Sequence, residues 1–200
     1  EQLIAKCTRV LSDATIDTLW RQRFIDMTEA ARLLAHRDMD LALFVLIEAN
    51  GKSMDQYSGK HALYCLVIGE LASNLLNWPD EEMHVLALAA LSMNVSMTAL
   101  QDTMAEQRTG LSDFQRSQVQ QHAKASADLL RQAGVTDPLW LYTVAQHHTV
   151  GTPEDQPSNT AGVRLANLLR RVDIYTAKLS RRGTRDSVTP ATAARDACLD

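Results

Sequence analysis

The sequence predicts an all-α protein. Of its 200 residues, 46% are hydrophobic but only 5% are aromatic, and the chain holds just eight glycines and five prolines. Leucine and alanine, which favour helices, are abundant, and the residues that break helices are sparse. Apolar side chains also recur with the period of about 3.6 residues that is typical of amphipathic helices. A chain of this length is enough for one domain with a substantial core and a helical extension.

The first fifty residues are expected to form a helical lead-in. Apolar residues show helical spacing in three segments, at 3–11, 16–34 and 41–47. Ser12-Asp13 offers a break after the first segment, and Asn50-Gly51 is a strong stop signal after the third. Nothing in this part indicates chemistry. We interpret it as a linker from an upstream domain or as a surface for a homodimer formed through the N-terminal helices.

Further helices are predicted in the rest of the chain. They are expected at 55–75, 80–91, 112–133, 138–148 and 161–180, and from 190 onward. Ser112 and Gln115 form a capping box for one of them, and Gly134 ends it. Asp137-Pro138 caps the next helix. Polar loops are expected at 98–110 and 149–160.

Four of the six histidines lie on segments that can converge on one pocket. His147 and His148 are adjacent at a helix end, His122 lies in the preceding helix, and His61 lies further back. Neutral imidazoles at convergent positions are the commonest transition-metal ligands, so the pattern indicates a metal site. The alternative is that the pair only caps a helix C-terminus, where the helix dipole favours an imidazolium. His61, considered by itself, would in that case be a hydrogen-bonded residue of the core.

The charge is distributed unevenly along the chain. The net charge is −4, but residues 156–200 carry eight arginines and lysines against four aspartates. A basic end on an acidic body suits a phosphate-bearing ligand or an acidic partner, and no nucleic-acid polymer is expected as a partner. The alternative interpretation is a solvated helix face.

Cysteine usage and hydropathy indicate the compartment. Cys7, Cys65 and Cys198 are odd in number and widely spaced, which predicts reduced thiols and a cytoplasmic location. No apolar run reaches the ~20 residues that a membrane span needs, and no signal-like segment opens the chain, so no membrane insertion is expected. The chain begins at Glu1 and stops within a predicted helix at Asp200, and a fragment of a longer protein is therefore expected.

From Asp55 to Ala194 the succession of residues resembles the HD-GYP family, a branch of the HD-domain phosphohydrolases. His61 matches the first histidine of the family pattern, and Ala89-Ala90-Leu91 matches the end of its apolar helix. The later ligands are matched by His122, His147-His148 and Val172-Asp173, and the arginines beyond them by Arg182 and Arg185. The resemblance implies an HD-domain-like helical bundle, with residues 1–50 as an N-terminal helical extension. Residues 51–200 would form the HD-GYP-like domain, with its C-terminal end cut off.

The departures from the family pattern fall on its catalytic residues. Met93-Asn94 stands where the family has its His-Asp dyad, and Ser96-Met97 replaces the following Gly-Lys. The loop after the histidine pair has no Gly-Tyr-Pro. Family members cleave a phosphodiester, typically cyclic di-GMP, with two or three metal ions that share an anionic carboxylate. The amide of Asn94 is neutral, the thioether of Met93 is too soft for Fe, Mn or Mg, and Met97 offers no ammonium to a phosphate.

The resemblance therefore implies a degenerate, catalytically inactive signalling domain of a bacterial protein. It would dock a signalling partner protein or sense cyclic di-GMP, with Arg182 and Arg185 at positions that approach nucleotide phosphates in the family. No cofactor is expected.

Two other readings stay open. The first is a divergent phosphohydrolase with one Zn, Fe or Mn ion on His122, His147, His148 and Asp173, with His61 as a further residual ligand. The second is an HDOD-like regulatory domain, which lacks such ligands, and the retained histidines argue against it.

Overall fold

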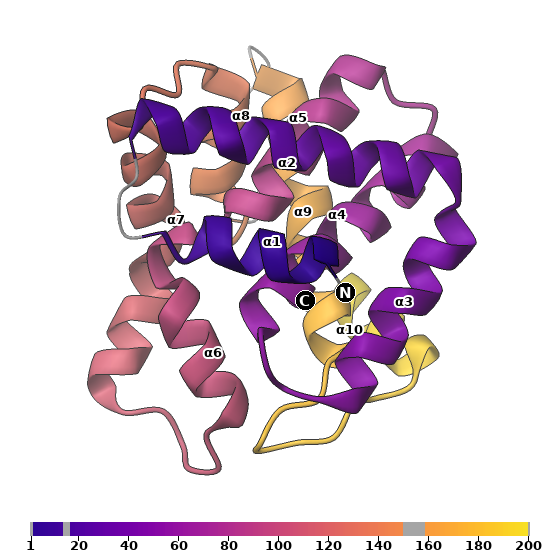
Figure 1. Cartoon of the computed structure of the whole chain (residues 1–200), viewed down its shortest axis with the longest axis vertical. Coiled ribbons are helices and arrows are strands. Elements are labelled where there is room, and N and C mark those ends of the chain that lie inside the picture. Colours follow the sequence, from indigo (N-terminus) through magenta and orange to yellow (C-terminus); the bar gives the residue numbers. More distant parts are fainter. Residues whose placement is uncertain (1, 14–16, 150–158, 200) are drawn as a thin grey trace.

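The chain forms a bundle of helices around two buried central helices (Figure 1). The computed structural model describes residues 2–13, 17–149 and 159–199. The α-helices are α1 (Gln2–Leu11), α2 (Thr18–Arg37), α3 (Met39–Lys52), α4 (Tyr57–Leu75), α5 (Asp80–Ser92), α6 (Thr98–Glu106), α7 (Asp113–Gln132), α8 (Pro138–Gln146), α9 (Thr160–Leu179) and α10 (Pro190–Leu199). A short 3₁₀ helix, η1 (Val95–Met97), joins α5 to α6. The described residues contain no strand, so the predicted all-α class is confirmed.

Local sequence signals set several of the helix ends as predicted. The side chain of Ser112 accepts from the backbone N–H of Gln115, and the Gln115 side chain accepts in return from the backbone of Ser112, so α7 begins with a capping box. Gly134, after the end of α7, has a φ of +82°, which glycine adopts without steric cost. Asp137 accepts from two backbone N–H groups at the start of α8.

The predicted polar loop at 98–110 is wrong over most of its length, because α6 occupies residues 98–106. The buried positions of this helix are Thr98, Gln101 and Ala105. They are spaced as one helical face and pack toward α4. Two of the three side chains are polar and the third is small, so hydrophobic periodicity could not reveal this face.

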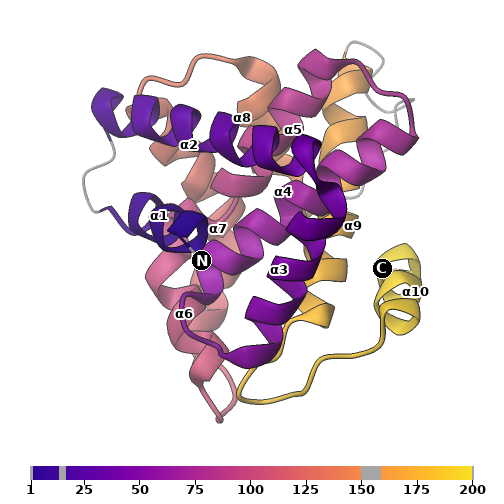
Figure 2. The same ribbon diagram turned by 45° about the vertical axis from the view of Figure 1, so that its right-hand side comes forward.

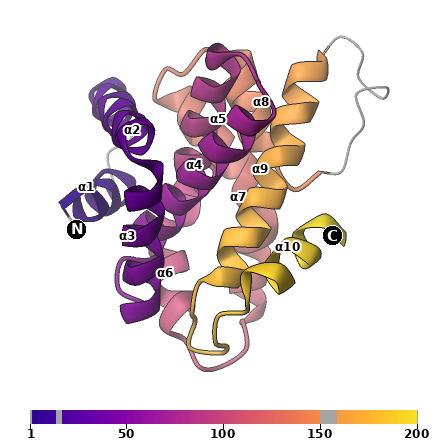
Figure 3. The same ribbon diagram turned by 90° about the vertical axis from the view of Figure 1, so that its right-hand side faces the viewer.

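The core lies around α4 and α5. In α5 every residue from Val85 to Ser92 is buried, as expected for a helix that is apolar nearly all round. Figure 3 shows α1, α2 and α3 on one side of these central helices, with α9 and α10 on the other. The turned view in Figure 2 shows the chain leaving α9 through an extended segment and returning as α10, which packs against α9.

The N-terminal helices share this core. Phe24 of α2 stacks between Trp20, at 5.0 Å, and Trp140 of α8, at 5.8 Å between ring centroids. Trp20 also donates its indole N–H to the carbonyl of Val10 at 2.8 Å. Residues 1–50 and the rest of the chain therefore bury their apolar side chains in one cluster. Residues 1–50, expected as an N-terminal extension, therefore have no hydrophobic core separate from that of residues 51–200 among the described residues.

A buried ion pair fastens α2 to α4. Arg32 Nε lies 2.6 Å from Glu70 Oε1, and the two side chains are only 9% and 1% exposed. The second oxygen of Glu70 lies 2.7 Å from His36 Nε2, and Arg32 also reaches Asp80, at the start of α5.

Helix α3 buries only Leu46 and Asn50. Its outer face exposes several large apolar side chains, Leu41, Phe44 and Ile47. The homodimer expected through the N-terminal helices stays a prediction.

Among the residues that the structure describes, one stretch is apolar enough to qualify as a membrane span by length and composition alone. It runs over residues 80–106, from α5 through α6, and 67% of its most apolar window is buried inside the bundle. A buried core helix passes the same test, so this finding is weak evidence for a span.

Candidate metal and ligand site

A cavity of about 520 Å³ lies among α4, α6, α7 and α9. Most of the sequence-predicted site residues line it, namely His61, Asn94, Met97, His122, His148, Asp173 and Arg182. Of the other predicted positions, His147 is fully buried beside His122, and Met93 is packed in the hydrophobic core. Arg185 is not among the lining residues. The loop at 150–158, where the Gly-Tyr-Pro motif is missing from the sequence, lies outside the described residues.

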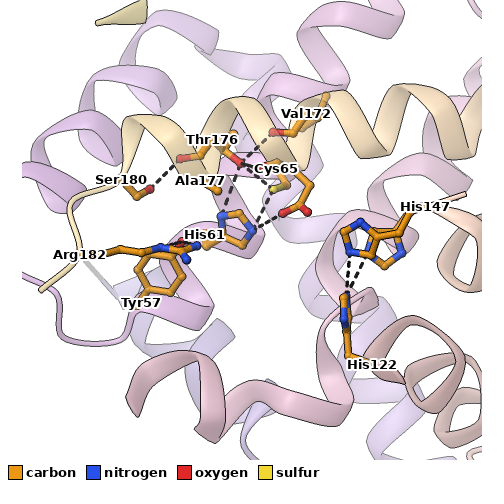
Figure 4. Close-up of polar contacts among 12 residues, drawn as sticks. Tyr57, His61, Cys65, His122, His147, Val172, Thr176, Ala177, Ser180 and Arg182 are labelled. Carbon is orange, nitrogen blue, oxygen red and sulfur yellow. Dashed lines mark hydrogen bonds and ion pairs between the residues drawn. The ribbon is translucent and has the colours of Figure 1, made fainter. Parts of the chain in front are cut away.

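Three histidines meet through their Nε2 atoms at one side of the cavity, and Figure 4 labels two of them, His122 and His147. His122 Nε2 lies 3.2 Å from His147 Nε2 and 3.3 Å from His148 Nε2. His122 comes from the buried face of α7. The other two follow directly after α8, because that helix ends at Gln146 and His147 is its C-cap residue. Sequence analysis predicted this convergence.

Backbone hydrogen bonds fix the ring protons of two of these histidines. His122 Nδ1 lies 2.6 Å from the carbonyl oxygen of Val119, and His147 Nδ1 lies 2.7 Å from that of Val144. A carbonyl oxygen only accepts, so each Nδ1 carries a proton and each Nε2 keeps its lone pair. His147 thus caps its helix through one nitrogen and presents the other to the cluster. His147 therefore caps the helix and also belongs to the cluster, which differs from the expected alternative of a pair that only caps the helix.

This arrangement fits a bound cation. Two lone pairs that face each other at 3.2 Å repel unless a positive centre lies between them. Nitrogens at about 2.0–2.1 Å from a tetrahedral Zn²⁺ are about 3.3–3.4 Å apart, close to the distances seen here. Burial lowers the pKa of His147 to about 3, and the neighbouring His148 adds to this effect. Burial likewise lowers the pKa of His122. Both rings are thereby kept neutral, which is the form that binds metals.

The opposite wall of the cavity carries a second cluster. His61 Nε2 lies 2.8 Å from Asp173 Oδ1, which joins α4 to α9. Burial disfavours the imidazolium of His61, but Cys65, Tyr57 and the Asp173 carboxylate together outweigh it and raise the pKa of His61 well above 6.5. Burial opposes ionisation of Asp173, but the hydrogen bond and the charge of His61 hold the Asp173 pKa below its usual value.

An arginine and a tyrosine extend this wall toward the cavity rim. Arg182 donates to the Tyr57 hydroxyl at 2.5 and 3.2 Å, and its guanidinium lies 5.0 Å from the centroid of the Tyr57 ring. Tyr57 in turn stacks on His61, with 5.5 Å between the ring centroids. Arg185 instead donates to the carbonyl oxygens of Ala177 and Lys178 at the end of α9. Of the two predicted arginines, only Arg182 therefore lines the cavity.

Sequence reasoning missed three residues of this wall. Tyr57 lies four residues before His61 and Cys65 four residues after it on α4, and Thr176 lies three residues after Asp173 on α9. Helical residues spaced by three or four share a face, so this spacing was the available signal. None of these residues belongs to the HD-GYP pattern.

Two of the three lost-ligand positions reach the cavity, and the third, Met93, lies in the hydrophobic core. Asn94 and Met97 line the cavity, and Asp173 is the only carboxylate among its described lining residues. Neighbouring Ser96 does not reach the cavity, because its hydroxyl donates to the carbonyl of His122 at 3.1 Å. The described part of the cavity therefore offers no lysine and no second carboxylate that could join Asp173 in bridging two metal ions.

No family model, no curated protein and no solved structure matches this chain. The likeness to the HD-GYP family thus depends on the ordered residues themselves.

Proposed function

We propose that the chain is a catalytically inactive, HD-GYP-like signalling domain that binds a phosphate-bearing ligand, a cyclic dinucleotide such as cyclic di-GMP, without hydrolysing it. One observation carries the proposal. The cavity joins a cationic rim at Arg182 to a histidine-rich floor, while the neutral Asn94 lies where a bridging carboxylate would be needed. Binding needs only the first feature, whereas two-metal hydrolysis needs the carboxylate as well.

Arg182 is suited to phosphate recognition. A guanidinium has five N–H donors, and Nε and Nη2 are the nitrogens that contact Tyr57. Tyr57 is buried, with its ring against His61 and the Arg182 guanidinium, so Arg182 is the member of this stack that can contact a ligand. The helical surface outside the cavity would bind a signalling partner protein, and this binding would depend on whether the cavity holds its ligand. A cytoplasmic bacterial setting is part of this proposal.

Calorimetry with cyclic di-GMP on the metal-free chain tests ligand binding. Arg182→Ala should weaken binding at least tenfold, because a charge-assisted contact to phosphate is lost. Arg131→Ala is a matched control, since Arg131 is half-exposed on α7 and pairs with Asp128 outside the cavity. If the wild-type chain gave no heat at high ligand concentration, the sensing function would be refuted.

A second function is favoured by the three-histidine cluster. Its nitrogen spacing suits one metal ion, so a one-metal phosphohydrolase that uses His122, His147, His148 and Asp173 is the alternative. Metal analysis and a cyclic di-GMP hydrolysis assay with added Mn²⁺ or Fe²⁺ separate the two functions. We expect no turnover. Turnover that His148→Ala abolishes would overturn the inactive assignment.

A further inference from the structure

Cys65 adds a thiol to the cavity wall that holds His61 and Asp173. It lies one turn after His61 on α4, and its Sγ is 3.7 Å from His61 Nε2. The ligand atoms of Cys65, His61 and Asp173 all lie within 4.8 Å of one another. Figure 4 shows Cys65 next to His61. Neither the HD-GYP pattern nor the three-histidine cluster includes a thiol.

Thr176 orients the His61 ring in the way a metal ligand requires. Its hydroxyl donates to the carbonyl of Val172 at 2.9 Å, so its oxygen is left to accept. His61 Nδ1 faces that oxygen at 3.5 Å and can donate its ring proton to it, so Nε2 is left to face either a second proton or a metal ion. Histidine ligands of metals show the same arrangement, with the second nitrogen held by an oxygen atom.

A cation is therefore needed between His61 Nε2 and Asp173 Oδ1, which are 2.8 Å apart. A proton would meet this need without Cys65, whereas a metal ion would use all three side chains. The distance of 3.7 Å between Cys65 Sγ and His61 Nε2 suits a metal ion. With Zn–S near 2.3 Å and Zn–N near 2.0–2.1 Å, tetrahedral geometry places sulfur and nitrogen about 3.5–3.6 Å apart. Asp173 must move back by about half an ångström to reach the corresponding N–O spacing.

The charge and burial of the three side chains also suit a divalent cation. A thiolate and a carboxylate together neutralise a 2+ ion, which a buried site requires. His61 and Cys65 are almost fully buried, and the Asp173 side chain is 17% exposed. His61 and Asp173 line the cavity, so the fourth coordination position faces it. Cys7 is equally buried, but among the described residues it belongs to no such cluster, and burial raises the pKa of its thiol to about 12.

We propose that Cys65 is a metal ligand that takes over from the lost Met93-Asn94 positions. With His61 and Asp173 it forms a site for one thiophilic divalent cation, for which Zn²⁺ is the best match. The site is distinct from the three-histidine cluster and does not depend on the proposed cyclic dinucleotide. A thiolate ligand restricts the ion to soft or borderline metals, which disfavours the Fe, Mn or Mg used for phosphodiester cleavage.

Titration of chelator-treated protein with Co²⁺ tests the proposal, because thiolate-bound Co²⁺ shows a sulfur-to-metal charge-transfer absorption. We expect this band in the wild-type chain at one Co²⁺ per chain. Cys65→Ser should abolish it while keeping an oxygen that can hydrogen-bond Thr176, and should weaken Co²⁺ binding at least tenfold. Cys7→Ser and Cys198→Ser are the matched controls and should keep the band, as should His148→Ala, which damages only the other cluster.

X-ray absorption of the Zn²⁺-loaded wild-type chain gives a second measurement that needs no variant. It should show one sulfur at about 2.3 Å from the metal. A band that survives in Cys65→Ser, or a zinc shell of nitrogen and oxygen only, would overturn the proposal and leave His61 and Asp173 as a proton-bridged pair. Neither result would affect the calorimetric test of the cyclic dinucleotide, which uses metal-free protein.

Discussion

Removing one partner of the buried Arg32–Glu70 pair should destabilise the fold strongly, whereas replacing both should not. Each side chain is less than a tenth exposed. Leaving one buried charge without its partner costs about 3–5 kcal/mol. Arg32 keeps Asp80 as a partner when Glu70 is replaced, so Glu70→Leu should cost about 3 kcal/mol, at the lower end of that range. Arg32→Met removes one of the two contacts of the Glu70 carboxylate and leaves only His36. The cost of this substitution in unfolding free energy should therefore fall within the same range.

Urea unfolding followed by circular dichroism measures these changes in the free energy of unfolding. The pair Arg131–Asp128 is a matched control, because its atoms are also 2.6 Å apart but its side chains are 52% and 48% exposed. Arg131→Met should cost less than about 1 kcal/mol. The double variant Arg32→Met/Glu70→Leu should lie within about 1 kcal/mol of the wild type or be more stable, since no unpaired charge stays buried. If Arg32→Met cost no more than Arg131→Met, the reasoning from burial would be refuted.

Three further predictions concern the cavity and its surroundings. A Cβ on Gly183 would lie 2.5 Å from a backbone carbonyl oxygen at the end of α6, so Gly183→Ala should lower stability by about 1–3 kcal/mol and weaken ligand binding. Thermal melts measure the stability, and Gly51→Ala, whose Cβ would meet nothing within 4 Å, is the control that should not be destabilised. The pKa of His147 is depressed to about 3 in the folded chain, so between pH 6.5 and pH 3 only the unfolded chain gains this proton. The stability that His147 contributes in metal-free protein should be full above pH 6.5 and should fall by about 3 kcal/mol by about pH 4.5. Urea unfolding at both pH values should show a smaller loss for His147→Gln, and an equal loss would count against this assignment. Met93→His with Asn94→Asp restores the family dyad and should raise bound Mn²⁺ by metal analysis, whereas unchanged stoichiometry would mean that more than the dyad has been lost.

Most helices could be predicted from the sequence because their ends carry local signals. The capping box at Ser112 and the glycine at Gly134 act through neighbouring backbone groups, and such signals need no knowledge of the fold. Helix α6 was missed for the opposite reason. Its buried face consists of Thr98, Gln101 and Ala105, and only the tertiary contact with α4 makes these residues a core face.

The site was predicted in part for a similar reason. The histidine pair and its partner His122 are conspicuous in the sequence, and the structure brings their nitrogens together. The thiol of Cys65 carries no such signal. Its proximity to Asp173 arises because α4 packs against α9, more than a hundred residues further along the chain. Contacts of this kind depend on how helices cross, which residue spacing within one helix does not determine.

The stacked rings of Trp20, Phe24 and Trp140 give the protein a built-in optical reporter. Two of the three tryptophans in the chain are fully or almost fully buried in this stack, while Trp78 lies beneath the guanidinium of Arg164. Any motion that lifts α2 from α8 would bring water to these two indoles and shift their emission to longer wavelength. Attachment of the N-terminal helices can therefore be followed in real time by intrinsic fluorescence, without a label.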